Sequence, residues 1–473
     1  MSFKLSYYVV FSNPIDETGR VLAFSTRSGK IILLSPLCHK CLINGDIQFI
    51  PLPILEDLFE AKIMVEREEQ ELENIVKENI ASSNDDNGLL RIIIQPSANC
   101  QLGCYYCGQT HSKINMSEKT HIHIINRVVK KLNIGQYNTL EVNWFGGEPL
   151  MALDEIRDIT QKLQAICTER MITYTATMTS NGLSLKPRVF TELARDLGLR
   201  SIDVTLDGTE DDHDKHRYTK GGGKSFATIY SNLNNIIHGE HFDRLDCKIT
   251  IRCNIDESNK DAFMPLMMKL KKDDILSKVT CYPMGIYSWG NDAHKGAVER
   301  NDFAQKELVW KSELFGMGLS AKVIPMRKKK LCVATTPSEE MVDAFGNVYN
   351  CTEVSYAPVY DAAEYKVGFV GGDTYFSLPV IQASDAANLA NWNNTLKENV
   401  FPCHTCNMLP VCGGGCPKQW YEGNAPCPTT KYVMPERLLF HYLVQRKPLM
   451  GLAERQQLVG FHNLQWVTNI LSE

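Results

Sequence analysis

The chain has 473 residues, of which 44% are hydrophobic and 22% are charged. At about 150 residues per domain, this length predicts two to four domains, each able to bury a core. The 50 Lys and Arg residues against 55 Asp and Glu give a formal net charge of −5, which disfavours non-specific nucleic-acid binding. The apolar stretch from Tyr7 to Phe11 is too short for a secretory signal, and no apolar run approaches the roughly 18 residues of a membrane span. We therefore expect a cytoplasmic protein.

Sixteen cysteines are the unusual feature of the composition. Cytosolic thiols stay reduced, so this number argues against a disulfide scaffold and for metal or iron–sulfur ligation. The cysteines also gather in the sequence: three lie at 100–107, two at 332 and 351, and five at 403–427. The other six are expected mainly to pack in the core: Cys38, Cys41, Cys167, Cys247, Cys253 and Cys281.

Residues 1–80 predict a small α+β domain that is followed by a linker. The pair Ser28-Gly29 predicts a hairpin turn, and the polar, turn-rich run 81–88 predicts the linker. Alternating and apolar runs predict strands at 5–11, 21–25, 30–34 and 62–65, and helices at 51–59 and 72–80.

Beyond the linker, strand-like and helix-like segments alternate six times. This pattern predicts a parallel sheet, either open or curled into a partial (β/α)6 barrel, with the active site at the C-terminal ends of the strands. The alternation fades near residue 320. Residues 332–427 are rich in loops and cysteines, as expected where metal clusters replace an apolar core, and 435–473 has helical spacing. The six expected strands are 90–94, 140–145, 173–179, 201–206, 247–255 and 278–283.

Directly after the first of these strands comes Cys100-Gln-Leu-Gly-Cys104-Tyr-Tyr-Cys107. Three thiolates on one loop can hold three irons of a [4Fe–4S] cluster and leave the fourth iron open to a small molecule. The alternative is a closed cluster or a zinc site with a distant fourth ligand. The position of the loop at a strand end favours the open cluster.

This spacing, with the aromatic Tyr106 before the last cysteine, resembles the radical S-adenosylmethionine (SAM) superfamily. The resemblance implies that SAM binds the open iron through its amine and carboxylate. Reductive cleavage of SAM would then give a 5′-deoxyadenosyl radical that abstracts a hydrogen atom from the substrate.

Further segments resemble the SAM-binding elements of that superfamily. Glycines let a backbone approach a ligand closely, and a loop carbonyl or Glu148 can accept a hydrogen bond from the SAM ammonium. A guanidinium fork suits the SAM carboxylate, which implies a role for Arg217, whereas His213 is expected to orient or cap. The implied SAM contacts are Tyr106, Gly146, Gly147, Glu148, Pro149, Asn181, Thr205 and Arg217.

Seven C-terminal cysteines resemble the SPASM domain of peptide-modifying radical SAM enzymes. Asp343 to Cys351 also reads as a hairpin that turns at Gly346-Asn347 and delivers Cys351 from a strand end. A zinc ribbon is the alternative for these cysteines. The resemblance implies that Cys332, Cys351 and Cys416 hold a first auxiliary cluster, and that Cys403, Cys406, Cys412 and Cys427 close a second one. With the SAM cluster, this makes three [4Fe–4S] clusters.

Two departures separate the chain from anaerobic sulfatase maturases, which carry an extra cysteine six residues after the first of the set and an aspartate after the second. Here these positions are Ser338 and Thr352. The catalytic residues therefore stay unknown, with Glu353 as the candidate for a displaced base.

Together these features predict an enzyme that crosslinks a ribosomally made precursor peptide, with a thioether as the favoured bond and an external flavodoxin- or ferredoxin-type electron donor. The alternatives are a maturase of a folded sulfatase or quinohemoprotein subunit, and a non-catalytic zinc or iron–sulfur binding module. Residues 1–80 fit the plan of a winged-helix-like module that binds a leader peptide by strand addition. The expected domains are leader recognition at 1–80, the radical SAM partial barrel at 89–318, the SPASM domain at 319–434 and a helical tail at 435–473.

Overall fold

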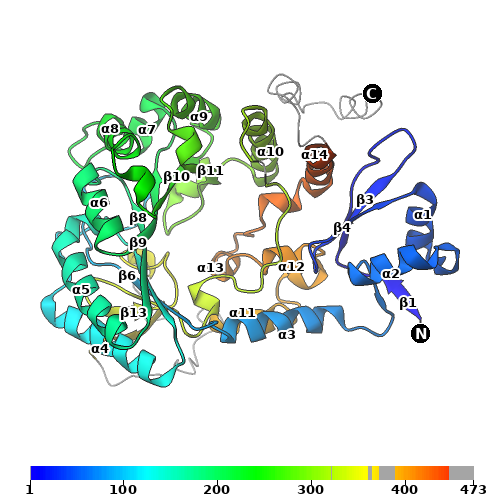
Figure 1. Cartoon of the computed structure of the whole chain (residues 1–473), viewed down its shortest axis with the longest axis horizontal. Helices are drawn as coiled ribbons and strands as arrows, with labels where there is room; N and C mark the ends of the chain where they lie inside the picture. The colour runs from blue at the N-terminus through cyan, green and yellow to red at the C-terminus, as the bar shows by residue number, and fades with distance from the viewer. Residues whose placement is uncertain (1, 321, 361–364, 372–388, 447–473) are drawn as a thin grey trace. The chain divides into compact units, whose positions relative to one another are not determined.

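The computed structural model describes residues 2–320, 322–360, 365–371 and 389–446. The chain divides into two compact units (Figure 1). Unit 1 comprises residues 1–83, 299–331 and 391–473, and unit 2 comprises residues 84–298 and 332–390. No helix of the described segments is long and apolar enough to cross a membrane.

Unit 2 is built on a nine-stranded sheet in the order β11-β10-β9-β8-β7-β6-β12-β13-β14. Its first six strands in the sequence run parallel and follow the order of the chain, which confirms the predicted partial barrel. These strands are β6 (Leu89–Ile94), β7 (Thr139–Trp144), β8 (Thr173–Ser180), β9 (Leu199–Thr205), β10 (Lys248–Ile255) and β11 (Thr280–Gly285).

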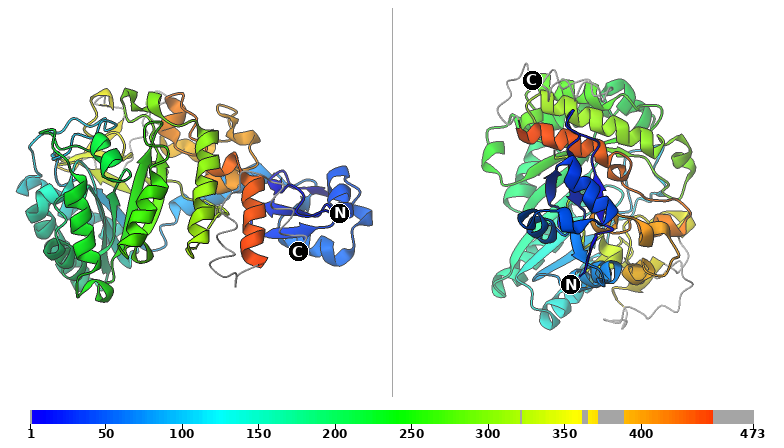
Figure 2. Two further views of the ribbon diagram at one scale, coloured as in Figure 1. Left: turned by 90° about the horizontal axis from the view of Figure 1, so that it is seen from above. Right: turned by 90° about the vertical axis from the view of Figure 1, so that its right-hand side faces the viewer.

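The helices that connect these strands cover the outside of the curved sheet (Figure 2). Residues that face the helices, such as Leu140 and Val142 on β7, are fully buried, whereas their neighbours Glu141 and Asn143 face the barrel interior and are only partly buried. The interior of this barrel is therefore polar. The helices are α4 (Glu118–Ile134), α5 (Leu153–Glu169), α6 (Pro187–Arg195), α7 (Glu210–His216), α8 (Phe226–Ile237) and α9 (Phe263–Lys272).

A second part of the chain extends the barrel sheet. Strand β12 (Glu340–Val342) pairs in parallel with β6, and β13 (Asn347–Tyr349) and β14 (Lys366–Phe369) continue the sheet antiparallel. The predicted hairpin turn is confirmed, because Gly346 has a φ of +86° between β12 and β13, and Cys351 follows two residues after β13. The β12–β6 pairing was not predicted, because it joins residues far apart in the chain.

Unit 1 contains the N-terminal α+β region. Strands β2 (Val9–Phe11), β3 (Val21–Ser25) and β4 (Ile31–Leu34) form an antiparallel sheet, and β1 (Phe3–Leu5) pairs with β5 (Met64–Glu66). The expected single strand 5–11 is therefore wrong, because the chain turns at residues 6–8 and its halves join different sheets. The helices here are α1 (Pro36–Asn44), α2 (Leu52–Glu60) and α3 (Glu71–Asn84).

The predicted linker 81–88 is only partly correct. Residues 81–84 continue helix α3, and only the segment that follows is a turn. The helix extends because Ser83 is buried, with its Oγ accepting a hydrogen bond from Asn393 Nδ2 at 3.5 Å. The last expected barrel strand is likewise displaced, to Thr280–Gly285.

The N-terminal region shares its core with the C-terminal part of unit 1. Tyr8, Ile75 and Val76 pack in one cluster with Trp392 and Cys403. Leu22 and Phe24 of β3 pack in another, with residues of the last described helix. The remaining helices of unit 1 are α10 (Arg300–Gly316), α11 (Trp392–Thr395), α12 (Leu409–Cys412), α13 (Pro417–Tyr421) and α14 (Met434–Arg446). The rest of the expected helical tail, 447–473, lies outside the described residues.

Candidate active site

The loop with the first three cysteines lies at the C-terminal end of β6 and is fixed by backbone hydrogen bonds. Gly103 N donates to Tyr218 O at 2.8 Å, Lys220 N donates to Gln101 O at 2.9 Å, and Glu148 N donates to Asn99 O at 2.8 Å. The loop is therefore tied to the loop after β7 and to the segment that follows α7, as expected for a site at the top of the barrel.

The three thiols of this loop share one enclosed environment. Burial raises the pKa of Cys100 to about 12 and that of Cys107 to about 11, and in both cases the neighbouring Cys104 adds to the effect. The Arg217 guanidinium opposes this shift at all three cysteines, because a positive charge favours the thiolate.

This donor set fits an iron–sulfur cluster with an open iron, since it offers three soft thiols and a compensating positive charge. Among the residues described, no three His, Cys, Asp or Glu side chains gather closely enough to hold a single metal ion. Ligation would replace the thiol protons, as for any cysteine-bound metal.

Tyr106 is the centre of a buried polar network. Its hydroxyl donates to Asp207 Oδ2 at 2.7 Å and accepts from Arg217 Nη1 at 2.6 Å and from Asn254 Nδ2 at 2.9 Å. Arg217 is 6% exposed, and its Nε has no partner among the described atoms. The network fixes the cluster loop from inside the barrel. The predicted contact of Arg217 with the SAM carboxylate stays a prediction.

Glu148 is fully buried, and its carboxylate is hydrogen-bonded within unit 2. Its carboxylate accepts hydrogen bonds from Ser180 Oγ at 2.8 Å, Asn181 N at 2.7 Å and Leu150 N at 3.1 Å. Burial raises the pKa of the Glu148 carboxyl, and these donors oppose that rise. Glu148 thus ties the end of β7 to the end of β8, and its contact with the SAM ammonium stays a prediction.

The two glycines before Glu148 are required by their surroundings. A Cβ on Gly146, whose φ is +113°, would lie 2.9 Å from Gln95 Cβ, and a Cβ on Gly147 would lie 2.5 Å from Asn99 O. Pro149 then opens a short 3-10 helix, Pro149–Ala152. The motif therefore brings the backbone of this loop directly against the cluster loop.

Asn181 lies beside the cluster loop, and His213 lies beside Asp207. Asn181 Nδ2 donates to Cys100 Sγ at 3.6 Å and to Gln101 Oε1 at 3.3 Å. His213 Nδ1 accepts from Asp207 N at 3.2 Å, in keeping with an orienting role. Thr205 ends β9 and is 7% exposed.

Sequence reasoning missed Asp207, Asn254 and Gln95. Asp207 and Asn254 hold the Tyr106 hydroxyl. Asp207 lies just after β9, near the predicted site residue Thr205, and Asn254 lies near the end of the neighbouring strand β10. Gln95 is fully buried, packs under Gly146, and neither amide atom has a partner among the described residues. Its place one residue after β6 was the only signal available in the sequence.

Four C-terminal cysteines come together in unit 1. Burial, with the neighbouring thiols of Cys412, Cys406 and Cys427, raises the pKa of Cys403 to about 12. Lys431 Nζ donates to Cys427 Sγ at 3.6 Å, which places a positive charge at this group. The four cysteines are those expected to close the second auxiliary cluster, and that assignment remains a prediction.

Three successive glycines shape the loop between Cys412 and Cys416. Gly413, Gly414 and Gly415 have φ angles of +69°, +88° and +72°, and a Cβ on Gly414 would lie 2.6 Å from a methyl carbon of Leu396. The indole nitrogens of Trp392 and Trp420 donate to the carbonyls of Gly413 and Gly414, respectively. These contacts turn the chain sharply after α12.

The ligands expected for the first auxiliary cluster fall in both units. Cys332 and Cys351 belong to unit 2, and Cys416 belongs to unit 1. Cys332 is exposed and precedes a 3-10 helix, whereas Cys351 is buried. Glu353 accepts a hydrogen bond from Trp289 Nε1 at its carbonyl, and its carboxylate acts electrostatically on Cys107.

A cavity of about 480 Å³ lies inside the barrel of unit 2. It is lined from β6 to β9 by Arg91, Glu141, Thr177 and Asp203, among others, and from the later segment by Cys332, Glu339 and Thr352.

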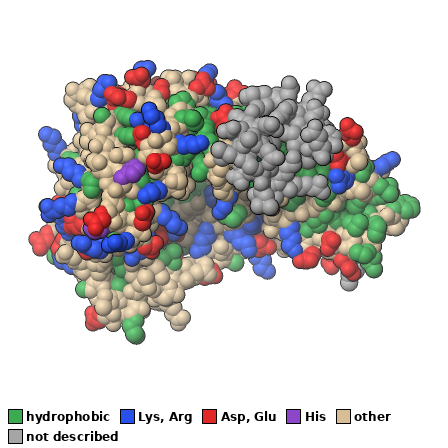
Figure 3. Space-filling model, turned by 45° about the horizontal axis from the view of Figure 1, so that its top comes forward, with side chains coloured by type: hydrophobic (Ala, Val, Ile, Leu, Met, Phe, Trp, Pro, Cys, Tyr) green, Lys and Arg blue, Asp and Glu red, His purple; other side chains and the backbone are tan. Residues whose placement is uncertain are grey.

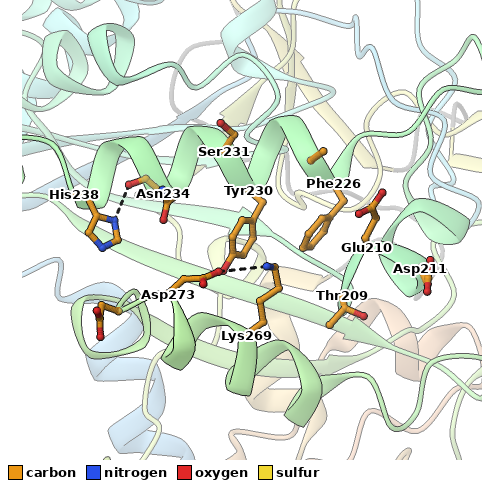
Figure 4. Close-up of a pocket in the computed structure, with 12 residues that line it drawn as sticks. Thr209, Glu210, Asp211, Phe226, Tyr230, Ser231, Asn234, His238, Lys269 and Asp273 are labelled. Atoms are coloured by element: carbon orange, nitrogen blue, oxygen red, sulfur yellow. Dashed lines mark hydrogen bonds and ion pairs between the residues drawn. The ribbon is translucent and has the colours of Figure 1, made fainter.

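A larger hollow, of about 890 Å³, is a groove on the outside of the barrel, along α8 and α9 (Figure 4). Its aromatic wall is already occupied: the Lys269 ammonium lies 4.4 Å from the centre of the Tyr230 ring, and Tyr230 Oη donates to Asp273 Oδ2 at 2.6 Å. The groove contains no cysteine. The barrel cavity is therefore the better candidate for the reaction site.

Residues 94–250, which include the cluster loop, the Gly146-Gly147 loop and Arg217, match the family model "Radical SAM superfamily". The chain is a radical SAM enzyme. This identification overturns the alternative of a non-catalytic binding module, and it implies SAM and an iron–sulfur cluster as cofactors.

Two curated relatives of the radical SAM enzyme are sulfatase-maturating enzymes. A cysteine-type anaerobic enzyme of Clostridium novyi is 23% identical over 73% of this chain and 92% of its own length. A serine-type enzyme of Bacteroides thetaiotaomicron is 22% identical over 71% of this chain and 84% of its own length.

Solved structures show the same fold. The structure titled anSMEcpe with bound AdoMet has a TM-score of 0.56 and 16% identity, and covers 76% of this chain and 97% of that one. Streptococcus suis SuiB bound to its precursor peptide SuiA has a TM-score of 0.50 and 13% identity, and covers 90% of this chain and 98% of that one.

We expect the radical SAM enzyme to lose stability in mild acid. Burial lowers the pKa of His111 to about 4, and it also lowers the pKa of His213 and His216. Their folded-state pKa values lie below the unfolded value of about 6.5, so the unfolded chain binds more protons below that pH. The contribution of these histidines to the free energy of unfolding is fully present above about pH 6.5 and is lost as the pH falls toward 4. For His111, which is partly exposed, the loss is on the order of 1–2 kcal/mol.

Thermal unfolding midpoints measured between pH 5 and pH 8 would check this expectation. His111→Gln should flatten the pH dependence, whereas the same change at the exposed His238 should leave it as in the wild type. An unfolding temperature that stays constant as the pH is lowered below 6.5 would contradict this expectation.

Proposed function

We propose that the enzyme modifies a ribosomally synthesised precursor peptide by forming an intramolecular crosslink. The observation that carries this proposal is a loop with three thiols at the C-terminal strand ends of a barrel whose interior holds a polar cavity. When bound, SAM and its cluster supply a 5′-deoxyadenosyl radical for hydrogen-atom abstraction. The residues of this chain hold the loop, through Glu148 and the Tyr106 network, and shield the reacting groups from water.

We further propose three [4Fe–4S] clusters, with about 12 irons per chain. Four of the seven C-terminal cysteines lie together in unit 1, which supports one complete auxiliary ligand set. The electron for SAM cleavage would come from an external flavodoxin- or ferredoxin-type protein.

A thioether is the bond we favour. Two closed auxiliary clusters need eight ligands, and the seven cysteines leave one position unfilled. A thiolate is the preferred ligand of an iron–sulfur centre, so a precursor cysteine is the chemically suited eighth ligand.

Mass spectrometry tests both parts of the proposal. The enzyme, SAM and reductant are incubated with a short peptide encoded beside its gene, and with a Cys→Ser form of that peptide. We expect a mass loss of two hydrogens and a crosslinked fragment from the first peptide only. A crosslink in the cysteine-free peptide would rule out the thioether and favour a carbon–carbon or carbon–oxygen bond, and an unmodified native peptide would contradict the proposed function.

Maturation of a folded sulfatase is the second candidate, because both curated relatives described above carry that name. Thr352 and Ser338 stand where those enzymes are expected to carry an aspartate and a cysteine. Incubation with a sulfatase-derived peptide distinguishes the two functions, since only a sulfatase maturase would convert its cysteine or serine to an aldehyde.

The N-terminal part of unit 1 is proposed to bind the leader of the precursor. Its three-stranded sheet ends in β4, whose partner is β3, so an extended peptide can pair with the other edge of β4. Hydrophobic side chains gather on this part of the molecule, at the right of Figure 3. In the N-terminal part of unit 1, Leu37, Phe49 and Leu52 are 66%, 67% and 68% exposed.

Replacing Phe49 and Leu52 together by Asp is expected to weaken binding of the full precursor by roughly 10- to 100-fold, because apolar anchors dominate such interfaces. Binding of the core segment without its leader should not change. Fluorescence anisotropy of labelled peptides measures both. The matched control is Ile134→Asp with Met171→Asp, two exposed apolar positions of unit 2. Equal precursor binding by both double variants would refute leader recognition at this surface.

A further inference from the structure

The walls of the barrel cavity are mostly polar. Thr177, Thr179, Ser201 and Thr352 bring hydroxyl groups to it, and Asn143 brings an amide. The Thr177 hydroxyl oxygen is buried and has no hydrogen-bond partner among the described atoms. A purely apolar group that filled this cavity would leave such atoms unpaired, at a cost of about 1–3 kcal/mol for each. The occupant should therefore be polar at one end.

The lining of the cavity carries more acidic than basic residues. Arg91, Glu141, Asp203 and Glu339 give three carboxylates and one guanidinium. Arg91 Nε donates to Glu141 Oε1 at 2.5 Å, and Arg91 Nη1 donates to Glu339 Oε1 at 3.1 Å. The guanidinium is thus committed to two of the carboxylates. The third, Asp203, has to be compensated by another group.

Asp203 receives hydroxyl donors and no close cation. Tyr282 Oη donates to Asp203 Oδ2 at 3.4 Å, and the Thr250 side chain also bonds the carboxylate. Arg252 lies near enough to act on Asp203 electrostatically, but its Nε donates to Asn254 Oδ1 at 2.7 Å. Within the described residues, no ion pair to Asp203 is formed within 4.0 Å. Burial raises the pKa of Asp203, as expected for a carboxylate that lacks a counter-charge.

We propose that the barrel cavity binds a lysine or arginine side chain of the peptide substrate, with the Asp203 carboxylate as its counter-charge. The peptide nature of the substrate rests on the function proposed above, whereas the charge preference rests on the cavity alone. The two ends of such a side chain match the lining. The cationic group meets Asp203 and the hydroxyls, and the methylene stem lies along the apolar residues Ile93 and Val333.

This assignment also selects a place in the peptide. The cavity lies inside the barrel whose C-terminal strand ends carry the three-cysteine loop, and it is lined mainly by the strands themselves, without a residue of that loop. Asp203 would thus determine which residue of the precursor is presented. It would act by binding that residue and would take no part in the transfer of hydrogen.

The test uses the anaerobic, cluster-loaded and unreduced enzyme with SAM, so that no turnover occurs. The probes are N-acetyl-lysine-N-methylamide, its uncharged norleucine analogue and the glutamate analogue, and binding is followed by saturation-transfer NMR and titration. The wild type should bind the lysine probe at least tenfold more tightly than the other two. Equal binding of the lysine and norleucine probes would overturn the proposal without any variant.

Asp203→Asn keeps the shape of the side chain and removes its charge. It should reduce the lysine preference to about twofold or less, with an unchanged dissociation constant for the norleucine probe. The matched control is Asp273→Asn, which removes a carboxylate from the outer groove and should keep the full preference. A lysine preference that survives in Asp203→Asn would refute the role of this residue. If the lysine preference holds while no precursor is modified, the proposed function fails and this inference stands. If the precursor is modified while the lysine preference is absent, this inference fails and the proposed function stands.

Discussion

Replacing Cys100, Cys104 and Cys107 together by alanine is expected to abolish reductive cleavage of SAM and to remove about a third of the protein-bound iron. The three thiols belong to one enclosed loop, and no other described cysteine is in the loop that joins β6 to α4. The C-terminal cysteines should keep their iron, because they lie on other segments. Iron analysis after anaerobic reconstitution and chromatographic detection of 5′-deoxyadenosine measure the two effects.

A control triple variant is available in this chain. Cys38, Cys41 and Cys167 are buried thiols in the apolar cores, away from every expected ligand group. Their joint replacement by alanine removes the same number of thiols and should keep both the iron content and SAM cleavage. Cleavage that persists in the first variant would show that the SAM cluster has other ligands.

Arg217→Met is expected to destabilise unit 2 by about 3–5 kcal/mol, because it breaks a buried charged network and leaves Asp207 without its compensating cation. The guanidinium also moderates the charge of the three cluster thiolates, so the variant should lose SAM-cluster iron more readily than the wild type. Chemical denaturation and the rate of iron release to a chelator measure these effects.

Arg244→Met serves as the matched control, since Arg244 is exposed in a short 3-10 helix of the same unit. The destabilisation by Tyr106→Phe should lie between those of the two arginine variants. This change removes the hydroxyl that links Arg217 to Asp207 and Asn254, but it keeps the charges of Arg217 and Asp207. An Arg217→Met protein as stable as the Arg244 control would show that the network contributes nothing to the fold.

The local parts of this structure were predictable. The strands of the barrel carry strong apolar patterns, and their order follows the chain, so the sequence alone led to a partial barrel with Cys100 at the end of its first strand. The turn at Gly346 was likewise predicted, because the signal lies within a few residues. The cysteine groups at 100–107 and 403–427 could be recognised for the same reason.

The parts that escaped prediction depend on contacts between distant segments. The pairing of β12 with β6 follows from no feature of either strand alone. Glu148 was predicted as a SAM contact, whereas its hydrogen bonds with Ser180 and Asn181, which depend on how β7 and β8 end side by side, were not foreseen. Asp203 was not singled out from the sequence. Its importance comes from the residues of other strands that face the same cavity.

The shared core of unit 1 has a consequence for how the protein is made. Residues 1–83 leave the ribosome well before their packing partners Trp392, Leu409 and Leu438 are synthesised. At about 5–20 residues per second, roughly tens of seconds separate the two ends, and unit 2 is completed mostly in between. During that time the apolar faces of Tyr8, Ile75 and Phe24 are exposed to chaperones. The loop from Cys403 to Cys412 packs on these faces, and it is therefore expected to take its final shape, and to receive its iron, only after both segments have been synthesised.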